Sequence, residues 1–406
     1  MKKAPLLTSK YLPTYVFVTS LFLLWGVAIT MGDLLNRRFQ TVLNVSISDS
    51  GLVQFSIFGA YFVMGIPAGI FMKKFGYKNG VIFGLALYAI GAFMFYPAAA
   101  AESFGFFRIA LFVLACGLAT LETVAHPFSA ALGHEDTSEQ RINLSQTFNG
   151  VGAIIGPMLG SYIMLRNVPT GDTATDLAPV KYLYLVIGLV VLSVAIAFWF
   201  VKVPPLNEAS ENASVEENNE KVMPLFQNRH FIWAAVAQFF NVAAQGATWA
   251  FFINYAVKYM PDMTDEKAGY YFAFSMVMLL VGRAVGTVLM RYIRPNVLLA
   301  TFAAANILLC LVISQTWGWV SFGALIMLNF FMSIMFPTIF GLGLRNLGPH
   351  KPRASSFIVM GVVGGAVFPP IMGAVADYNV ALSYLTPIVC YAVVFLFGLV
   401  LYKPKN

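Results

Sequence analysis

The chain has 406 residues, of which 59% are hydrophobic and only 11% are charged, and its mean hydropathy is +0.75. This composition excludes a soluble globular domain and indicates a protein that crosses a membrane many times. The net charge of +7 comes from basic residues spread over many loops without a dense stripe, which argues against a nucleic-acid partner.

The apolar residues fall into segments of about 20 residues, the length of helix that spans the hydrocarbon core of a bilayer. Helices are the only spanning structure that fits this pattern, so we predict an all-α membrane protein. The first segment lacks a convincing cleavage site, so we expect a retained helix there. The twelve predicted segments are 14–39, 49–72, 79–99, 106–132, 142–165, 181–202, 229–259, 267–290, 296–314, 317–345, 353–376 and 381–402.

A polar stretch in the middle of the chain divides these segments six and six. Residues 203–228 contain five glutamates among Asn, Ser and Pro, a composition typical of a flexible linker. Glycines and prolines repeat on either side of it, because a shift of 213 residues places Gly152, Pro157 and Gly160 on Gly365, Pro370 and Gly373. We therefore predict two pseudo-symmetric six-helix bundles, 1–202 and 229–406, that arose by duplication.

The basic residues indicate how the chain is oriented. If both termini share one side of the membrane, most of the 25 Lys and Arg residues lie on that side. The positive-inside rule then places both termini and the 203–228 linker in the cytoplasm. We expect a multi-pass protein of the bacterial inner membrane.

Several classes of chemistry have no counterpart in the sequence. It contains no P-loop, no clustered metal ligands and no nucleophile with a plausible base partner. We therefore expect neither an enzyme nor ATP-driven transport, and no metal or other cofactor. Cys116, Cys310 and Cys390 all fall inside predicted helices, which argues against a disulfide framework.

Two polar side chains in the fourth segment indicate a functional site. Glu122 lies about 5 Å past the centre of this predicted helix, and His126 follows at i+4 on the same face. A charge at a helix centre is unfavourable by roughly 3 kcal/mol, so such residues nearly always face a polar interior and carry function. A purely structural hydrogen bond for Glu122 and a packing role for His126 are the alternatives.

The first segment carries a second polar group. Asp33 has Asn36 and Arg37 on the same face, at i+3 and i+4. Arg37 favours the ionised form of a neighbouring carboxyl. A structural ion pair between Asp33 and Arg37 is therefore an alternative to any role in proton transfer.

Amide side chains recur on the fifth, seventh and tenth segments. Amides hydrogen-bond hydroxyl groups as donor or acceptor, and an indole stacks on the apolar face of a pyranose ring. We predict a lining for a neutral, hydroxyl-rich solute, although buried amides can also simply join helices. The candidates are Gln146, Asn149, Asn241, Gln245, Trp249 and Asn329, with Gln238, Asn254 and Tyr255 as further members. Arg283, in the eighth segment, is expected to reach the membrane surface or to brace an inner gate.

Two six-helix halves joined by a cytoplasmic linker form the architecture of the major facilitator superfamily. The loop G-I-F-M-K-K-F-G-Y-K, residues 69–78, resembles its signature between helices two and three, with Lys73 in place of the usual acidic residue. The stretches L-E-T-V-A-H-P (121–127), S-Q-T-F-N-G-V-G-A-I-I-G-P (145–157) and A-Q-F-F-N-V-A-A-Q-G-A-T-W-A-F-F-I-N-Y (237–255) are similar to the fucose permease family of fucose–galactose–glucose proton symporters.

This resemblance implies that Asp33 takes the coupling proton and that Glu122 couples the proton to the sugar. We expect a secondary transporter, functional as a monomer in the lipid bilayer, that imports a monosaccharide or derivative with a proton and in which His126 and Asn36 also contact substrate. Proton-antiport efflux of sugars or amphipathic compounds, an uncoupled facilitator and a membrane receptor are the alternatives. Gly32 and His126 stand where the family commonly has Asn, which leaves the identity of the sugar open.

Overall fold

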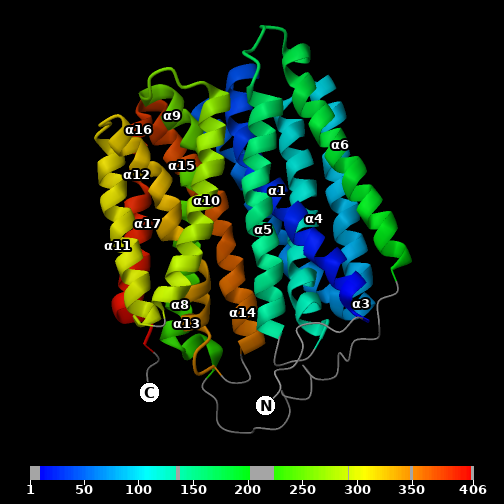
Figure 1. Ribbon diagram of the computed structural model, residues 1–406, viewed down its shortest axis with the longest axis vertical. Helices are drawn as coiled ribbons and strands as arrows, with labels where there is room; N and C mark the ends of the chain where they lie inside the picture. The colour runs from blue at the N-terminus through cyan, green and yellow to red at the C-terminus, as the bar shows by residue number, and fades with distance from the viewer. Residues whose placement is uncertain (1–9, 134–137, 202–223, 291, 348–350, 404–406) are drawn as a thin grey trace. The chain divides into compact units, whose positions relative to one another are not determined.

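The computed structural model describes residues 10–133, 138–201, 224–290, 292–347 and 351–403, and these ranges contain helices and no strand. The chain divides into two compact units. Unit 1 comprises Met1–Val45 and Gly59–Leu206, and unit 2 comprises Ser46–Phe58 and Asn207–Asn406. In Figure 1 most of unit 1 is coloured blue to green and most of unit 2 yellow to red. Most of the predicted 203–228 linker lies outside the described residues.

The first half of the chain supplies six long helical stretches. They are α1 (Leu12–Val42), α2 (Ile47–Ser50) with α3 (Leu52–Ala100), α4 (Phe104–Ala131), α5 (Ser138–Gly160) continued by the π-helical turn η2 (Ser161–Leu165), and α6 (Thr173–Phe200). α3 holds two of the six, because Gly76 interrupts it with φ 80° and ψ 169°. This φ is one that residues with a side chain rarely adopt, so the glycine makes the turn in the 69–78 loop possible.

The second half consists of shorter pieces. They are η3 (Leu225–Gln227), α8 (Arg229–Ala250), α9 (Phe252–Tyr259), α10 (Asp265–Leu289), α11 (Pro295–Ser314), α12 (Trp319–Met332), α13 (Met335–Gly343), α14 (Lys351–Met360), η5 (Gly361–Val363), α15 (Gly364–Tyr378), α16 (Val380–Ser383), α17 (Pro387–Leu396) and η6 (Phe397–Leu401). Each predicted segment of this half corresponds to one helix or to consecutive pieces of one.

Eleven of the twelve predicted segments form helices that are long and apolar enough to cross a membrane, counted over the described residues. The exception is the seventh, 229–259, which forms α8 and α9. The amides of Gln238, Asn241 and Gln245 lower the mean hydropathy of α8, and these are the side chains that made this segment a candidate for substrate binding. The expectation of an all-α membrane protein is confirmed.

Close helix pairs hold each unit together. In unit 1, α1 packs against α5, and a Cβ atom added to Gly26 or Gly152 would collide with a backbone carbonyl oxygen of the other helix. In unit 2, α8 packs against α15, and a Cβ atom on Gly364 would collide with the carbonyl oxygen of Phe239. Gly364 lies one position before Gly365, the residue matched to Gly152, and it serves the same purpose as Gly152: it lets two backbones approach closely.

An aromatic core fills unit 1 between α1, α3, α4 and α6. Phe39 packs on Phe107 with ring centroids 4.8 Å apart, and Phe95 lies 5.4 Å from the same ring. Phe95 also stacks on Tyr184, with centroids 3.7 Å apart. All four rings are buried. The edge contact between Phe95 and Phe107 adds to the stabilisation that burial of the rings provides.

Residues 46–58 belong to unit 2, whereas the helix that continues from them at Gly59 belongs to unit 1. The carboxylate of Asp377, near the end of α15, accepts hydrogen bonds from the backbone N–H groups of Ile47 at 2.9 Å and Ser48 at 3.3 Å. A Cβ atom on Gly373 would lie 2.7 Å from the Cα of Ser48, which again shows a close backbone approach. The start of α2 is therefore fastened to α15 by charge-assisted hydrogen bonds.

Candidate functional site

Glu122 is partly buried on α4, in a crevice between α4 and α1. The crevice has a volume of ≈ 10 Å³, about the space of one water molecule, and its walls are mainly apolar. It is lined by Leu21, Phe22, Trp25, Leu121, Glu122 and Ala125. Because apolar walls do not solvate a charge, the crevice suits a carboxyl group that is neutral while it is enclosed.

His126 is held by two hydrogen bonds that fix its tautomer. Its Nδ1 lies 2.9 Å from the backbone carbonyl oxygen of Glu122, an atom that can only accept, so Nδ1 carries the hydrogen. Its Nε2 lies 2.6 Å from Nε2 of Gln146, whose amide N–H can then donate to the bare ring nitrogen. The neutral imidazole therefore links α4 to α5, and its contact with Glu122 is to the backbone.

Aromatic side chains surround this histidine. The ring of Phe22 meets it edge-on with centroids 5.0 Å apart, and Trp25 does so at 6.5 Å. The Trp25 indole N–H donates to the hydroxyl oxygen of Tyr61 at 2.5 Å. Tyr61 in turn lies within electrostatic range of Glu122. Trp25 and Tyr61 thus belong to the site, although no sequence pattern predicted them.

The two predicted amides of α5 both lie beside His126 and the crevice. Gln146 and Asn149 are each partly exposed. Asn149 donates from Nδ2 to the carbonyl oxygen of Phe22 at 3.2 Å, which ties α5 to α1 beside the crevice. Its amide oxygen is the end that could accept a bond from a solute hydroxyl. The structure therefore brings together Glu122, His126, Gln146 and Asn149.

Asp33 lies elsewhere in unit 1. It is eight residues beyond Trp25 on α1, about 12 Å along the helix, and is 7% exposed. Tyr184 of α6 lies within electrostatic range of Asp33. Asn36 is fully buried and Arg37 is partly exposed. The three predicted residues of the first helix therefore form a separate group, at a different depth from Glu122.

Arg38, beside this group, joins two helices. Its guanidinium donates to the backbone carbonyl oxygens of Asn167 at 3.2 Å and Asp176 at 2.5 Å. The Asp176 carboxylate accepts from the backbone N–H groups of Thr170 and Gly171 at 2.9 Å and 3.2 Å. The structure buries Arg38 within α1, where it anchors the start of α6.

In unit 2 a chain of hydrogen bonds joins three helices. Trp249 of α8 donates from its indole N–H to Oδ1 of Asn329 at 2.7 Å. Asn329 of α12 donates from Nδ2 to the hydroxyl of Ser275 on α10 at 2.8 Å. All three side chains are buried, and Asn329 is 0% exposed. Both ends of this amide are therefore engaged in positioning Trp249.

The other amides of α8 differ in exposure. Gln245 is partly exposed, whereas Asn241 is 3% and Gln238 is 0% exposed. Tyr255 of α9 is fully buried and donates to the carbonyl oxygen of Ile313 at 2.8 Å, which is a packing role. Asn254 is also buried. Gln245 is therefore the predicted α8 amide best placed to meet a solute in this conformation.

Arg283 lies on α10, beside the break between α12 and α13. Pro337 has no N–H group to donate to the carbonyl oxygen of Ser333 four residues earlier. The Nε of Arg283 is 3.5 Å from that oxygen and donates to it. Arg283 thus compensates for a backbone bond that the proline removes. A role in a gate stays a prediction.

Comparison with known proteins identifies the family. A profile of the Major Facilitator Superfamily matches residues 16–369. The chain is also 39% identical to the L-fucose-proton symporter of Escherichia coli (strain K12), with 96% of this chain and 93% of that protein covered. The chain belongs to the major facilitator superfamily. It is a multi-pass membrane protein, as its apolar helices indicate, and the other members that it matches are transporters.

Further relatives in the superfamily are named for sugars. The glucose/galactose transporter of Brucella abortus biovar 1 (strain 9-941) is 33% identical, with 94% of this chain and 92% of that protein covered. The crystal structure of the superfamily transporter FucP in the outward conformation is 38% identical, with a TM-score of 0.68 over 96% of this chain and 98% of that one. The resemblance to the fucose permease family is confirmed.

A more distant superfamily structure supports the fold alone. The D-xylose-proton symporter is 13% identical, with a TM-score of 0.76 over 98% of both chains. The two chains therefore share one fold although they have little sequence in common. The Glu122 cluster is a feature of individual side chains, and its chemistry has to be argued from those residues.

Proposed function

We propose that this superfamily member is a secondary transporter that imports a monosaccharide or a close derivative together with a proton. The observation that carries the proposal is the partly buried carboxyl of Glu122 in an apolar crevice, beside a hydrogen-bonded His126–Gln146 pair, in a chain 39% identical to an L-fucose-proton symporter. The proton is the coupling ion, and the proposal includes no other cofactor and no enzymatic reaction.

The coupling follows from the cost of enclosing a charge. A carboxylate without a counter-ion is costly in apolar surroundings, so the occluded transporter favours a protonated Glu122. When the site opens to water on the side of lower proton concentration, the carboxylate is solvated and the proton leaves. Sugar binding is coupled to this step because the solute would contact α1 and α4, which line the crevice, and α5 beside them.

Recognition of the solute is assigned to the side chains around the crevice. Trp25 offers an apolar ring face, and Gln146 and Asn149 offer amide groups for hydroxyls. His126 contributes by orienting Gln146. In unit 2 we retain Asn241, Gln245 and Trp249 as substrate residues, with Asn329 acting through Trp249.

The first-helix group has a separate proposed role. Asp33 is the second proton-coupling residue, with Asn36 and Arg37 in the same group, and a lasting ion pair with Arg37 would remove this role. Because about 12 Å of helix separates Asp33 from the level of the crevice, a proton would pass between Asp33 and Glu122 by way of water or a change of conformation.

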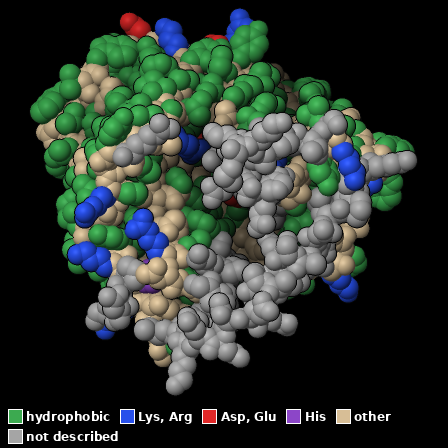
Figure 2. Space-filling model, turned by 60° about the horizontal axis from the view of Figure 1, so that its bottom comes forward, with side chains coloured by type: hydrophobic (Ala, Val, Ile, Leu, Met, Phe, Trp, Pro, Cys, Tyr) green, Lys and Arg blue, Asp and Glu red, His purple; other side chains and the backbone are tan. Residues whose placement is uncertain are grey.

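Orientation and location complete the proposal. Figure 2 turns the bottom of Figure 1 forward and shows Lys and Arg side chains scattered over the described surface there, with few Asp or Glu side chains. By the positive-inside rule we place this face and both termini in the cytoplasm. We propose a monomer in the bacterial inner membrane as the working unit.

The test is transport by the purified chain in liposomes with L-fucose, D-galactose and D-glucose under an imposed pH gradient. We expect inward accumulation of at least one sugar, abolished in Glu122→Gln while sugar counterflow is retained, because glutamine is neutral like the protonated carboxyl but carries no proton that it can release. Glu102→Gln, an exposed carboxyl at a helix end, is the matched control and should accumulate sugar normally. Undiminished uphill uptake by Glu122→Gln contradicts the mechanism. Sugar that moves only in the direction opposite to proton flow contradicts import with a proton.

A further inference from the structure

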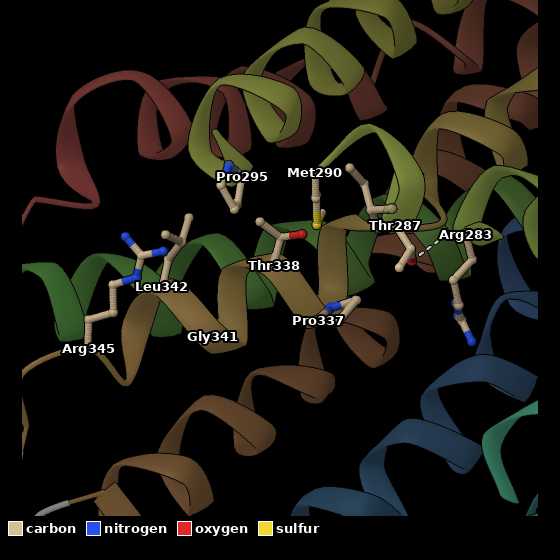
Figure 3. A pocket seen from close by; sticks show the side chains of 10 residues that line it. Arg283, Thr287, Met290, Pro295, Pro337, Thr338, Gly341, Leu342 and Arg345 are labelled. Atoms are coloured by element: carbon tan, nitrogen blue, oxygen red, sulfur yellow. Dashed lines mark hydrogen bonds between the residues drawn. The ribbon is translucent and has the colours of Figure 1, made fainter. Parts of the chain in front are cut away.

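A second cavity lies in unit 2, far along the chain from Glu122. It has a volume of ≈ 320 Å³. The last turns of α10, the first residue of α11, and α13 with its flanking residues line it (Figure 3). It is lined by Arg283, Thr287, Met290, Pro295, Ile334, Pro337, Thr338, Gly341, Leu342 and Arg345. The buried Trp249–Asn329–Ser275 chain is not part of its lining.

The charge of this cavity is wholly positive. Arg283 and Arg345 lie at its opposite ends in Figure 3, and no carboxylate is among the lining residues. The sequence has no Asp or Glu between Glu266 and Asp377, nor any in α8, the helix against which α13 packs. Within that acid-free stretch the basic residues are Lys267, Arg283, Arg291, Arg294, Arg345, Lys351 and Arg353. The neighbouring helices therefore supply no counter-ion for the two guanidinium groups that line the cavity.

One buried hydroxyl in the cavity also lacks a partner. Thr338 is 6% exposed, and its Oγ1 has no hydrogen-bond partner among the described residues. Figure 3 shows this oxygen directed across the cavity toward Met290. The neighbouring hydroxyl of Thr287 is engaged, because it donates to the carbonyl oxygen of Arg283 at 2.7 Å. A buried hydroxyl without a partner is costly, so Thr338 would gain from a ligand that accepts its hydrogen.

A gap separates Thr338 from Arg345. The two residues are seven positions apart, about 10 Å of helix, with Gly341 between them. A Cβ atom added to Gly341 would meet nothing within 4 Å, so the glycine leaves open space there. The Thr338 hydroxyl faces Met290 in this structure, and rotation about its Cα–Cβ bond would turn it toward Gly341, where an oxyanion could accept from it and from the Arg345 guanidinium. Met290, Pro295 and Leu342 would provide apolar walls for the rest of the ligand.

We propose that this cavity binds a phosphate ester, with its phosphate held by Arg345 and Thr338 and with Arg283 adding positive potential from the far end. A guanidinium group can donate two parallel hydrogen bonds to the oxygens of a phosphate, and the apolar walls suit the organic part of an ester. Such a group can come from an anionic phospholipid of the adjacent leaflet or from a soluble sugar phosphate. The site is independent of the sugar and proton site in unit 1.

The experiment measures ligand-induced thermal shifts and dissociation constants on the purified full-length chain in detergent. One arm uses dioleoylphosphatidylglycerol, with phosphatidylcholine as the zwitterionic control, and the other uses glycerol 3-phosphate and glucose 6-phosphate, with glycerol and glucose as controls. Stabilisation by the phosphatidylglycerol alone assigns the site to lipid, and stabilisation by the soluble esters assigns it to a metabolite. If neither arm stabilises the protein more than its controls do, the proposal is wrong.

Variants separate this cavity from general attraction between charges. Arg345→Gln should weaken binding roughly ten- to hundredfold, because it removes a charge-assisted hydrogen bond, and Arg283→Gln should weaken it less. Arg294→Gln removes a charge outside the cavity lining and should bind as the wild type does. An equal loss in Arg294→Gln and Arg345→Gln would overturn the assignment.

A pocket-filling pair provides a test that leaves every charge in place. Gly341→Leu fills the open space over the proposed phosphate and should abolish binding. Gly323→Leu, on α12, also enters open space but outside the cavity, and should have no effect. Sugar accumulation by these variants in ligand-free liposomes should persist, so failure of this proposal is distinguishable from failure of the proposed transport function. Full ligand binding by a folded Gly341→Leu variant would refute the site.

Discussion

His126 shows how much of the site depends on a few atoms. Sequence spacing placed the imidazole on the same face as Glu122, which is correct, but its partners are the Glu122 backbone and the amide of Gln146. Helical periodicity gives the face on which a side chain lies and not the atoms with which it bonds. Gln146 lies 20 residues away on another helix, and no spacing rule connects the two.

The His126–Gln146 bond leads to a prediction about solute affinity. In His126→Leu the Gln146 amide loses its acceptor, and an unpaired amide that is partly buried costs about 1–3 kcal/mol. We expect weaker sugar binding and a lower melting temperature, whereas His126→Asn, which can still accept through its amide oxygen, should lose less of both. Binding isotherms and thermal unfolding of the two variants are the measurements, and equal behaviour of Leu and Asn would contradict the role of the bond.

At the scale of the helix, pairing depends on glycines that admit a neighbouring backbone. The repeat from Gly152, Pro157 and Gly160 to Gly365, Pro370 and Gly373 was visible in the sequence, and the close approach of α1 to α5 and of α8 to α15 gives it a physical reason. The glycine that contacts the partner carbonyl in unit 2 is Gly364, one position earlier than the matched Gly365. Sequence alignment of weak repeats does not resolve such a shift.

Gly364→Val should therefore damage unit 2 severely. Its Cβ would overlap the carbonyl oxygen of Phe239, an atom of the backbone that has little room to move. We expect destabilisation of about 3 kcal/mol, at the upper end for overpacking, and a loss of monodisperse protein. Gly323→Val, where the added carbon enters open space, is the control. The measurement is the yield of the size-exclusion peak together with its melting temperature, and a normal peak for Gly364→Val would show that the pair can separate without cost.

The helices could be predicted from the sequence, but the break between α12 and α13 could not. A bilayer requires about 20 apolar residues for each crossing, so hydropathy alone gave all twelve segments, usually within a few residues of the observed ends. The break between α12 and α13 was not predicted. It follows from Pro337, whose missing N–H frees the carbonyl oxygen of Ser333, and from Arg283, which comes from another helix to bond it. Such compensation depends on tertiary contacts.

At the scale of the whole molecule, the boundary in the middle of the sequence is not the only place where the chain passes from one compact unit to the other. The sequence predicted a boundary in the 203–228 linker, between halves of six helices. In the structure, residues 46–58 also belong to unit 2. Hydropathy does not detect this, because the segment is part of one continuous apolar helix in either case. The feature that fastens it, Asp377, is a single carboxylate at the far end of the sequence.

Removal of that carboxylate should loosen the segment. In Asp377→Ala the N–H groups of Ile47 and Ser48 lose their acceptors, a capping interaction that contributes about 1 kcal/mol. We expect faster amide hydrogen exchange at residues 46–50, with an intermediate rate in Asp377→Asn, which keeps one acceptor oxygen. Hydrogen exchange followed by mass spectrometry is the measurement. Exchange at the wild-type rate in Asp377→Ala would mean that packing against Gly373 is sufficient.

The fastening of α2 to α15 also has a consequence for biosynthesis. Ile47 and Asp377 are 330 positions apart, so residues 46–58 leave the ribosome long before the helix on which they pack. Throughout that interval α15 is absent, and the contacts of the segment with α15 form among the last of the chain. If the two halves are produced as separate polypeptides cut within 203–228, the amino-terminal piece retains the 46–58 segment without its docking surface. Co-expression should therefore yield both pieces in greater amount than either gives alone, and equal yields would show that this contact is dispensable during assembly.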